Sequence, residues 1–112
     1  MRILKITDEE ILFDDGRKIE YHHSQDCCED NYADFSQLEE EALEYTFNSD
    51  LKFEFVDESG FRFGDERRMF FVPCYSNQNG YYSSDISIVF DGKEVLHGEC
   101  KWIEESCLIS KE

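Results

Sequence analysis

Residues 22–30 read His22-His23-Ser24-Gln25-Asp26-Cys27-Cys28-Glu29-Asp30, and we expect this stretch to organise the fold. It holds two of the three histidines, two of the five cysteines and three carboxylates within nine residues. Zinc in proteins takes four ligands, most often cysteine sulfur and histidine nitrogen. The stretch is therefore a candidate metal site at the end of a strand.

The segment before this stretch has the alternation of a strand, and the alternation distinguishes the two histidines. Asp15-Gly16 is a hairpin turn signal, after which the chain returns as residues 17–23. Successive side chains of a strand point to opposite faces, so His23 shares a face with Tyr21. We expect His23 to point inward and His22 to point outward.

The expected metal is a structural zinc ion, which would fix the loop that follows this strand. Its predicted ligands are His23, Asp26, Cys27 and Cys28. A complete site needs ligands from elsewhere, for which the candidates are Cys74, His97, Cys100 and Cys107.

Three other interpretations of the stretch stay open. A buried histidine can be satisfied by hydrogen bonds beside cysteines that pack as small apolar residues. The oxygen-rich loop could suit calcium, although it lacks the ligand spacing and central glycine of an EF-hand. A cysteine nucleophile with a histidine base is also conceivable. The surrounding carboxylates argue against this nucleophile, because they raise the pKa of a thiol.

Alternating apolar and polar residues predict strands in most of the chain. The expected strands cover residues 1–6, 11–13, 17–23, 51–55, 61–63, 67–75, 82–90 and 95–103. Turn signals stand at Asp15-Gly16, Ser59-Gly60, residues 77–80 and Asp91-Gly92. One helix is expected, with Ser36 as N-cap, Glu39 completing a capping box, and an end near Thr46. We predict an α+β fold, an antiparallel meandering sheet with one short helix packed on it, in a single domain over residues 1–112.

The charge of the chain limits its partners. Its 27 acidic and 11 basic residues give a formal net charge of −16. Direct binding to DNA or RNA is disfavoured, because contacts to phosphate need lysine and arginine. A charge of this size attracts basic surfaces, which favours a basic protein partner, including one whose own ligand is nucleic acid. The alternative is that the carboxylates only keep the surface solvated.

The apolar pattern contains no membrane-spanning segment. The longest apolar runs are only a few residues, and residues 1–8 lack the apolar region of a signal peptide. We therefore expect no membrane association and a cytoplasmic location. The five cysteines would then stay reduced or bind metal.

Two segments resemble an uncharacterised domain family of bacteria and their phages. Residues 23–29 resemble the family's His-x-Gln-Asp-Cys-Cys-Glu signature, and residues 75–83 are similar to its Ser-Asn-Gly-Tyr-Tyr-Ser segment, with one extra residue before the Asn-Gly. The resemblance implies a small soluble domain of phage or prophage type. It also selects His23 over His22, and it implies no activity.

Charge, size and this resemblance together suggest a function. Carboxylates on an acidic phage protein can compete with phosphates for the lysines and arginines of a host protein. CRISPR effector nucleases hold their guide–target duplex in a positively charged channel. We expect a non-enzymatic inhibitor that binds such a basic surface, most concretely an anti-CRISPR protein. The expected contact residues lie on the acidic helix and are Glu39, Glu40, Glu41 and Glu44.

Other acidic clusters could make the contact, and two other functions are compatible with the sequence. The further clusters are Asp57 with Glu58, Asp65 with Glu66, and Glu104 with Glu105. One alternative function is a metal-dependent or cysteine hydrolase, in which Asp26 or Glu29 would serve as general base. Another is a regulatory module with reduced cysteines and no metal.

Overall fold

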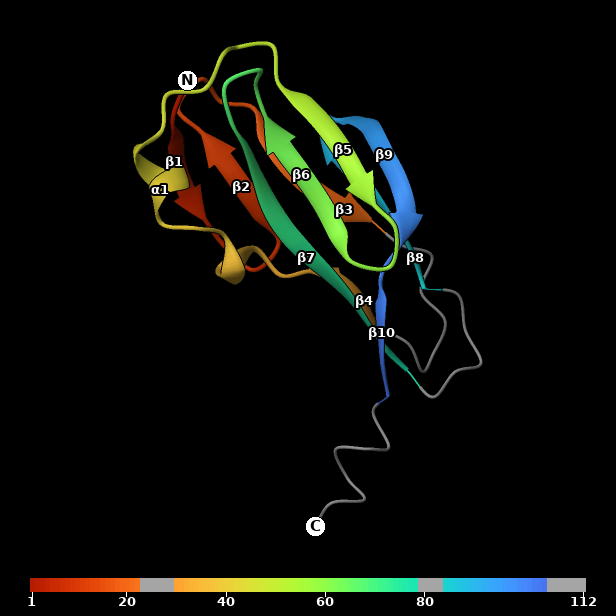
Figure 1. The fold of residues 1–112 in the computed structure, drawn as a ribbon. Helices are drawn as coiled ribbons and strands as arrows, with labels where there is room; N and C mark the ends of the chain where they lie inside the picture. Colours follow the sequence, from red (N-terminus) through yellow and green to blue (C-terminus); the bar gives the residue numbers. More distant parts are fainter. Residues whose placement is uncertain (23–29, 79–83, 105–112) are drawn as a thin grey trace.

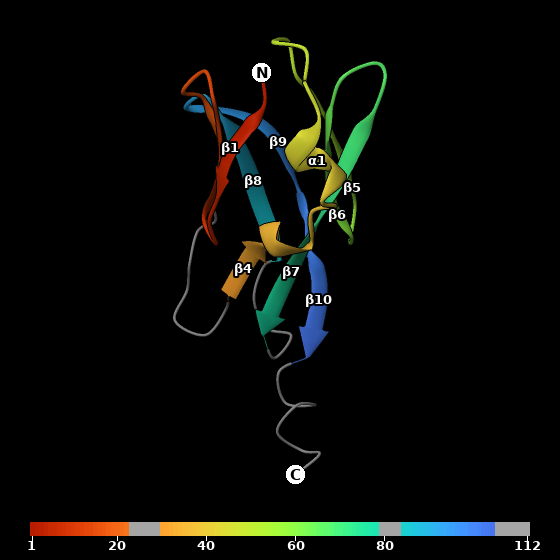
Figure 2. The same cartoon turned by 90° about the vertical axis from the view of Figure 1, so that its left-hand side faces the viewer.

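The computed structural model describes residues 1–22, 30–78 and 84–104, and strands make up most of these residues (Figure 1). The strands form two sheets. Figure 2, a side view, shows them as two layers, and the apolar side chains of both layers meet in a single core. The architecture of the described residues is therefore a β-sandwich.

The first sheet has five antiparallel strands in the order β1-β2-β3-β8-β9. Their bounds are Ile3–Ile6 (β1), Glu10–Phe13 (β2), Lys18–His22 (β3), Asp85–Phe90 (β8) and Lys93–Glu99 (β9). The Asp91-Gly92 turn has positive φ at both residues, 54° and 79°, as tight hairpins require. The predicted alternation is confirmed in β3, where Ile19 is buried and His22 is exposed.

The second sheet has the order β10-β7-β6-β5, and β4 also pairs with β7. The bounds are Asp30–Ala33 (β4), Lys52–Val56 (β5), Gly60–Gly64 (β6), Met69–Gln78 (β7) and Lys101–Glu104 (β10). Every pair is antiparallel except β10 with β7, which run parallel. β7 thus has three partner strands, and it is the longest strand among the described residues.

The α+β prediction is wrong, and so is the single meandering sheet. β3 pairs with β8, far along the chain, so the strands divide between two sheets. In place of the expected helix, the chain forms a 3₁₀ turn, η1 (Phe35–Gln37), and a four-residue helical turn, α1 (Glu41–Glu44). Packed strands, not a helix, therefore cover both sides of the core.

Local and tertiary contacts together explain why the helix does not form. The carboxylate of Asp34, not the hydroxyl of Ser36, caps the first turn by accepting the Ser36 N–H at 3.2 Å. The backbone is extended at Leu38, whose side chain is buried, and extended again at Tyr45. A short helix is marginal by itself, so the burial of these apolar side chains determines the path of the chain.

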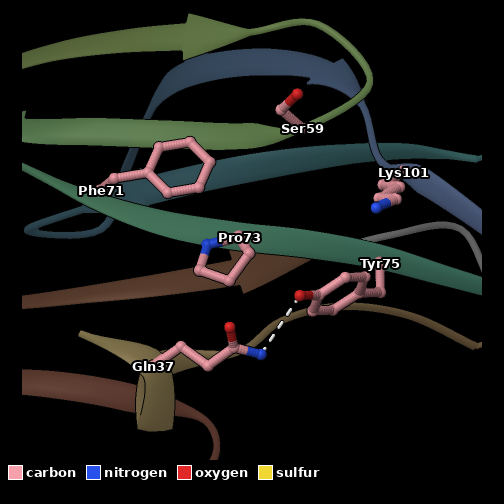
Figure 3. Close-up of a pocket in the computed structure, with 6 residues that line it drawn as sticks. All are labelled: Gln37, Ser59, Phe71, Pro73, Tyr75 and Lys101. Atoms are coloured by element: carbon pink, nitrogen blue, oxygen red, sulfur yellow. Dashed lines mark hydrogen bonds between the residues drawn. The ribbon is translucent and has the colours of Figure 1, made fainter.

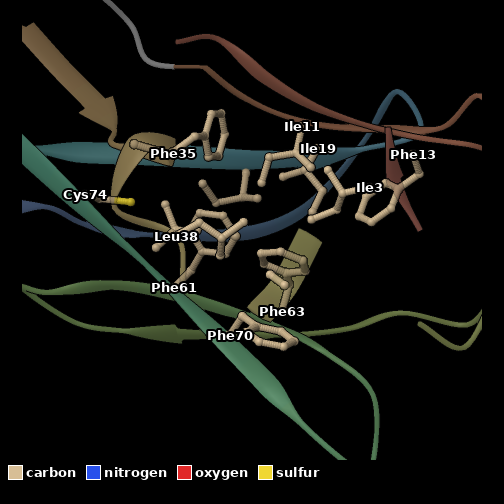
Figure 4. Close-up of a cluster of buried hydrophobic side chains, with 14 of the residues drawn as sticks. Ile3, Ile11, Phe13, Ile19, Phe35, Leu38, Phe61, Phe63, Phe70 and Cys74 are labelled. Atoms are coloured by element: carbon tan, nitrogen blue, oxygen red, sulfur yellow. The ribbon is translucent and has the colours of Figure 1, made fainter. Parts of the chain in front are cut away.

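Aromatic side chains dominate the core between the sheets (Figure 4). Phe13 comes from the first sheet, whereas Phe63 and Phe70 come from the second. Phe47, from the loop after α1, packs between them, with its ring centroid 5.8, 5.6 and 5.6 Å from those of Phe13, Phe63 and Phe70. Offset and edge-on contacts of this kind stabilise a core beyond the area that they bury.

Gly98 allows the two sheets to meet at one side of the sandwich. A Cβ atom at residue 98 would lie 2.3 Å from the ring of Phe55 on β5, well inside van der Waals contact. The absence of a side chain on β9 at this point makes room for the ring. Just beyond, the Glu58 N–H donates to the Glu99 carbonyl at 2.9 Å.

The carboxylate of Asp65 is buried and holds the turn between β6 and β7. It accepts the backbone N–H groups of Arg67 at 3.0 Å and Arg68 at 3.2 Å. It also accepts the Tyr45 hydroxyl at 2.8 Å and the Asn48 N–H at 3.1 Å. Burial raises the pKa of Asp65, but these hydrogen bonds outweigh burial and hold the pKa well below its ordinary value. The ionised carboxylate therefore joins the loop that carries the Phe47 ring to the start of β7.

We predict that Asp65→Asn lowers the free energy of unfolding at pH 7 by about 2–4 kcal/mol, because an amide oxygen cannot accept all of the hydrogen bonds that the carboxylate accepts. The folded pKa of Asp65 is depressed, so its contribution is complete above the unfolded pKa of about 4 and declines as the pH falls below it. Urea unfolding of both proteins at pH 7 and at pH 3 measures this. Glu66→Gln, the exposed neighbour, is the control and should have little effect. An equal wild-type advantage at both pH values would contradict the assignment.

Candidate functional site

The four predicted zinc ligands, His23, Asp26, Cys27 and Cys28, lie outside the described residues. Cys107 also lies outside them. Of the other candidate ligands, Cys74 and Cys100 are buried and His97 is exposed. Within residues 1–22, 30–78 and 84–104, no group of three or more histidine, cysteine or carboxylate side chains could hold a metal ion. The zinc site stays a prediction.

The carboxylates of the expected helix are all exposed, but two of them already have a partner. Arg68 pairs with Glu41 at 2.6 Å and with Glu39 at 2.8 Å. The hydrogen bond that Arg68 donates to Glu41 raises the pKa of Arg68 further above its ordinary range. The Arg68 guanidinium thus neutralises part of the charge of this surface. Glu40 and Glu44 are the carboxylates of the surface that are more available to a partner.

Arginine side chains are mostly committed to carboxylates within the protein. Arg17 pairs with Asp15 at 2.8 Å, and Arg62 pairs with Glu54. With Arg67 on Asp65 and Arg68 on Glu39 and Glu41, four of the five arginines are engaged in this way. These guanidinium groups are therefore less available to phosphate, whereas many carboxylates face the solvent.

A second acidic surface forms where the β5–β6 turn meets the end of β9. We call Asp57, Glu58 and Glu99 the acidic ridge. All three are exposed, and the hydrogen bond from the Glu58 N–H to the Glu99 carbonyl brings the two segments together. Glu58 has a φ of 62°, in the left-handed region that favours glycine. A carboxylate is therefore held at the tip of this turn at a conformational cost.

A pocket of about 300 Å³ lies next to the acidic ridge on the outer face of the second sheet (Figure 3). Its lining residues are Gln37, Ser59, Phe71, Pro73, Tyr75 and Lys101. Phe71 and Pro73 supply apolar surface, and the Gln37 amide donates to the Tyr75 hydroxyl at 3.1 Å. Ser59 directly follows Glu58, and Lys101 comes two residues after Glu99, so the pocket and the ridge adjoin. We call this the Phe71 pocket.

Strand pairing creates a line of polar side chains that the sequence analysis missed. His97 on β9 lies opposite Ser87 on β8, with Nδ1 3.0 Å from the Ser87 Oγ, while its Nε2 lies 3.3 Å from the Asp85 carboxylate. The Asp91-Gly92 turn alone would place Leu96 opposite Ser87. A bulge between the Val89–Glu94 and Ile88–Leu96 pairs shifts the register by one residue and brings His97 there, so the hairpin signal did not predict this pairing. The histidine is 52% exposed and the aspartate 38%, whereas acyl transfer needs a water-excluding site with oxyanion donors. We interpret the line as a cross-strand polar pairing on a solvated face.

Comparison with known proteins places the chain in a family. A model described as a domain of unknown function, DUF7448, matches residues 2–88. The chain belongs to the DUF7448 family. The match spans β1 to β7 and most of β8, and includes all of the Phe71 pocket except Lys101. The expectation of an uncharacterised family is confirmed at this level, and β9 and β10 lie beyond the match. No curated protein and no solved structure matches the chain.

The helical segments among the described residues are short. None of them is long and apolar enough to cross a bilayer.

We predict about one zinc ion per chain in protein purified without a histidine tag or chelator. His23→Ala and Cys27→Ser should each lose most of the metal, because each removes a ligand. His22→Ala is the matched control and should keep it, since alternation directs His22 away from the core. Elemental analysis of the four proteins measures the content. Wild-type protein without zinc, or equal loss in His22→Ala and His23→Ala, would contradict the prediction.

Proposed function

We propose that this DUF7448 protein is a non-enzymatic inhibitor that binds the basic surface of a nucleic-acid-handling protein. The observation that carries the proposal is the distribution of charge. The net charge is −16, and four of the five arginines form ion pairs with carboxylates of the same chain. The acidic ridge is exposed at one side of the sandwich. Carboxylates arranged in this way can occupy lysines and arginines that otherwise bind phosphate.

The Phe71 pocket gives this surface a second component besides charge. Stable protein interfaces have an apolar centre with a polar rim, and few residues carry most of the affinity. Phe71 is 37% exposed, and it lies in a pocket whose border carries polar groups. The combined surface suits a partner that places an apolar or aromatic side chain next to basic residues. Glu40 and Glu44 form a second candidate contact surface.

The most concrete partner that we propose is a CRISPR effector nuclease. Its channel for the guide–target duplex is strongly positive, so it presents the basic surface that the acidic ridge requires. The resemblance of residues 23–29 to an uncharacterised domain family of bacteria and their phages supports this class of partner. In this proposal the zinc ion has a structural role and contributes to stability.

We predict that Glu58→Gln/Glu99→Gln weakens binding to a guide-loaded CRISPR effector nuclease about tenfold, equivalent to about 1.4 kcal/mol. Phe71→Ala should weaken binding by a similar factor or more if the pocket holds a partner side chain. Glu40→Gln/Glu44→Gln removes the same number of charges elsewhere and is the matched control. Titration of each variant against a panel of such nucleases measures its affinity, and inhibition of target cleavage is a second readout.

The control defines what would contradict the proposal. If both double variants weaken binding equally, the interaction depends on total charge and not on the acidic ridge. If the control alone weakens it, the α1 surface is the contact. If the wild-type protein neither binds nor inhibits any nuclease of the panel, the CRISPR proposal fails.

A further inference from the structure

Two cysteines far apart in the sequence lie side by side in the core. Cys74 is on β7, where Figure 4 shows its side chain directed into the core, and Cys100 lies between β9 and β10. The parallel pairing of β10 with β7 joins Lys101 to Tyr75 and Trp102 to Ser76. One step back in this register places Cys100 beside Cys74. Both are free thiols, with 0% and 2% of their surface exposed.

The backbone around the two cysteines is fixed from both sides. The Cys74 N–H donates to the Ser59 carbonyl at 3.0 Å, and the Cys100 N–H donates to the Ser84 carbonyl at 2.8 Å. Neighbouring strands are separated by about 4.8 Å, which falls within the range of about 4.4–6.8 Å between the Cα atoms of a disulfide. The Cys100 side chain is near enough to that of Cys74 to raise the pKa of the Cys74 thiol. A bond between the sulfurs would therefore need side-chain rotation but little movement of the backbone.

We propose that Cys74 and Cys100 form a reversible disulfide when the protein meets a small disulfide oxidant such as oxidised glutathione. One cysteine thiolate attacks a sulfur of the oxidant, forms a mixed disulfide and releases one glutathione thiol. The second cysteine thiolate attacks the protein sulfur of that mixed disulfide and releases the second thiol. The protein loses two electrons and two protons, and the oxidant gains both as two thiols.

The environment of the pair determines which cysteine reacts first. The hydrogen bond with Cys100, together with burial, raises the pKa of Cys74 and makes it a poor nucleophile. Cys100 immediately precedes β10, whose pairing among the described residues is with β7 alone. Separation of β10 from β7 would expose Cys100 first. The reaction should therefore be slow in the native state and limited by this local opening.

The bond would join β10 covalently to β7 and close the loop of residues 74–100. A closed loop of this size reduces the entropy of the unfolded chain, so we expect Tm to rise by roughly 10 °C.

The test is to incubate the folded wild-type protein with oxidised glutathione, block free thiols, and map crosslinked peptides by mass spectrometry. We expect a peptide pair that joins Cys74 to Cys100, a raised Tm, and reversal of both by dithiothreitol. Cys100→Ala replaces a buried thiol with a small apolar group and should show neither change. A cooperative unfolding transition of this variant in dithiothreitol shows that it folds.

Two results would overturn the proposal. One is a set of crosslinks or glutathione adducts at Cys27, Cys28 or Cys107 without any link between Cys74 and Cys100. The other is a Cys74–Cys100 link that forms in urea but not in the folded protein.

Discussion

The buried carboxylate of Asp65 is the interaction on which most of the structure depends. It binds the loop that carries Phe47 over the core and the backbone turn that begins β7. β7 in turn pairs with β4, β6 and β10, and it alternates between core residues and residues of the Phe71 pocket. A single ionised group thus fixes both the aromatic core and the strand that presents the candidate binding surface.

A surplus of sixteen negative charges must be accommodated without unfolding the chain. Like charges repel, and the repulsion opposes compaction. The aromatic core and the internal arginine–carboxylate pairs offset it in the described residues. The same pairs place guanidinium groups beside carboxylates and leave the acidic ridge exposed. The placement of the few arginines therefore contributes to stability, and it also leaves the acidic ridge free for the proposed binding.

Local patterns predicted much of the strand content, because the two-residue alternation is a property of each segment by itself. The turn at Asp91-Gly92 was recognisable for the same reason. The helix prediction failed because a capping box is also local, whereas burial of Leu38 and capping by Asp34 decided the outcome. Asp57 and Glu58 of the acidic ridge were recognisable as an acidic cluster. Their contact with Glu99 was not predictable, since it depends on the contact of β5 with β9 that Gly98 permits. The predicted metal ligands lie in residues 23–29, outside the described structure.

We propose that carboxylates of this protein take the place of phosphates on a basic partner. The most direct test is the salt dependence of its affinity for a guide-loaded CRISPR effector nuclease, with target DNA as competitor. We expect affinity to fall at least about tenfold between roughly 50 and 200 mM salt, as phosphate binding does, and target DNA and the protein to exclude each other. Affinity that is independent of salt, or a stable complex that holds the nuclease, its target DNA and this protein together, would contradict it.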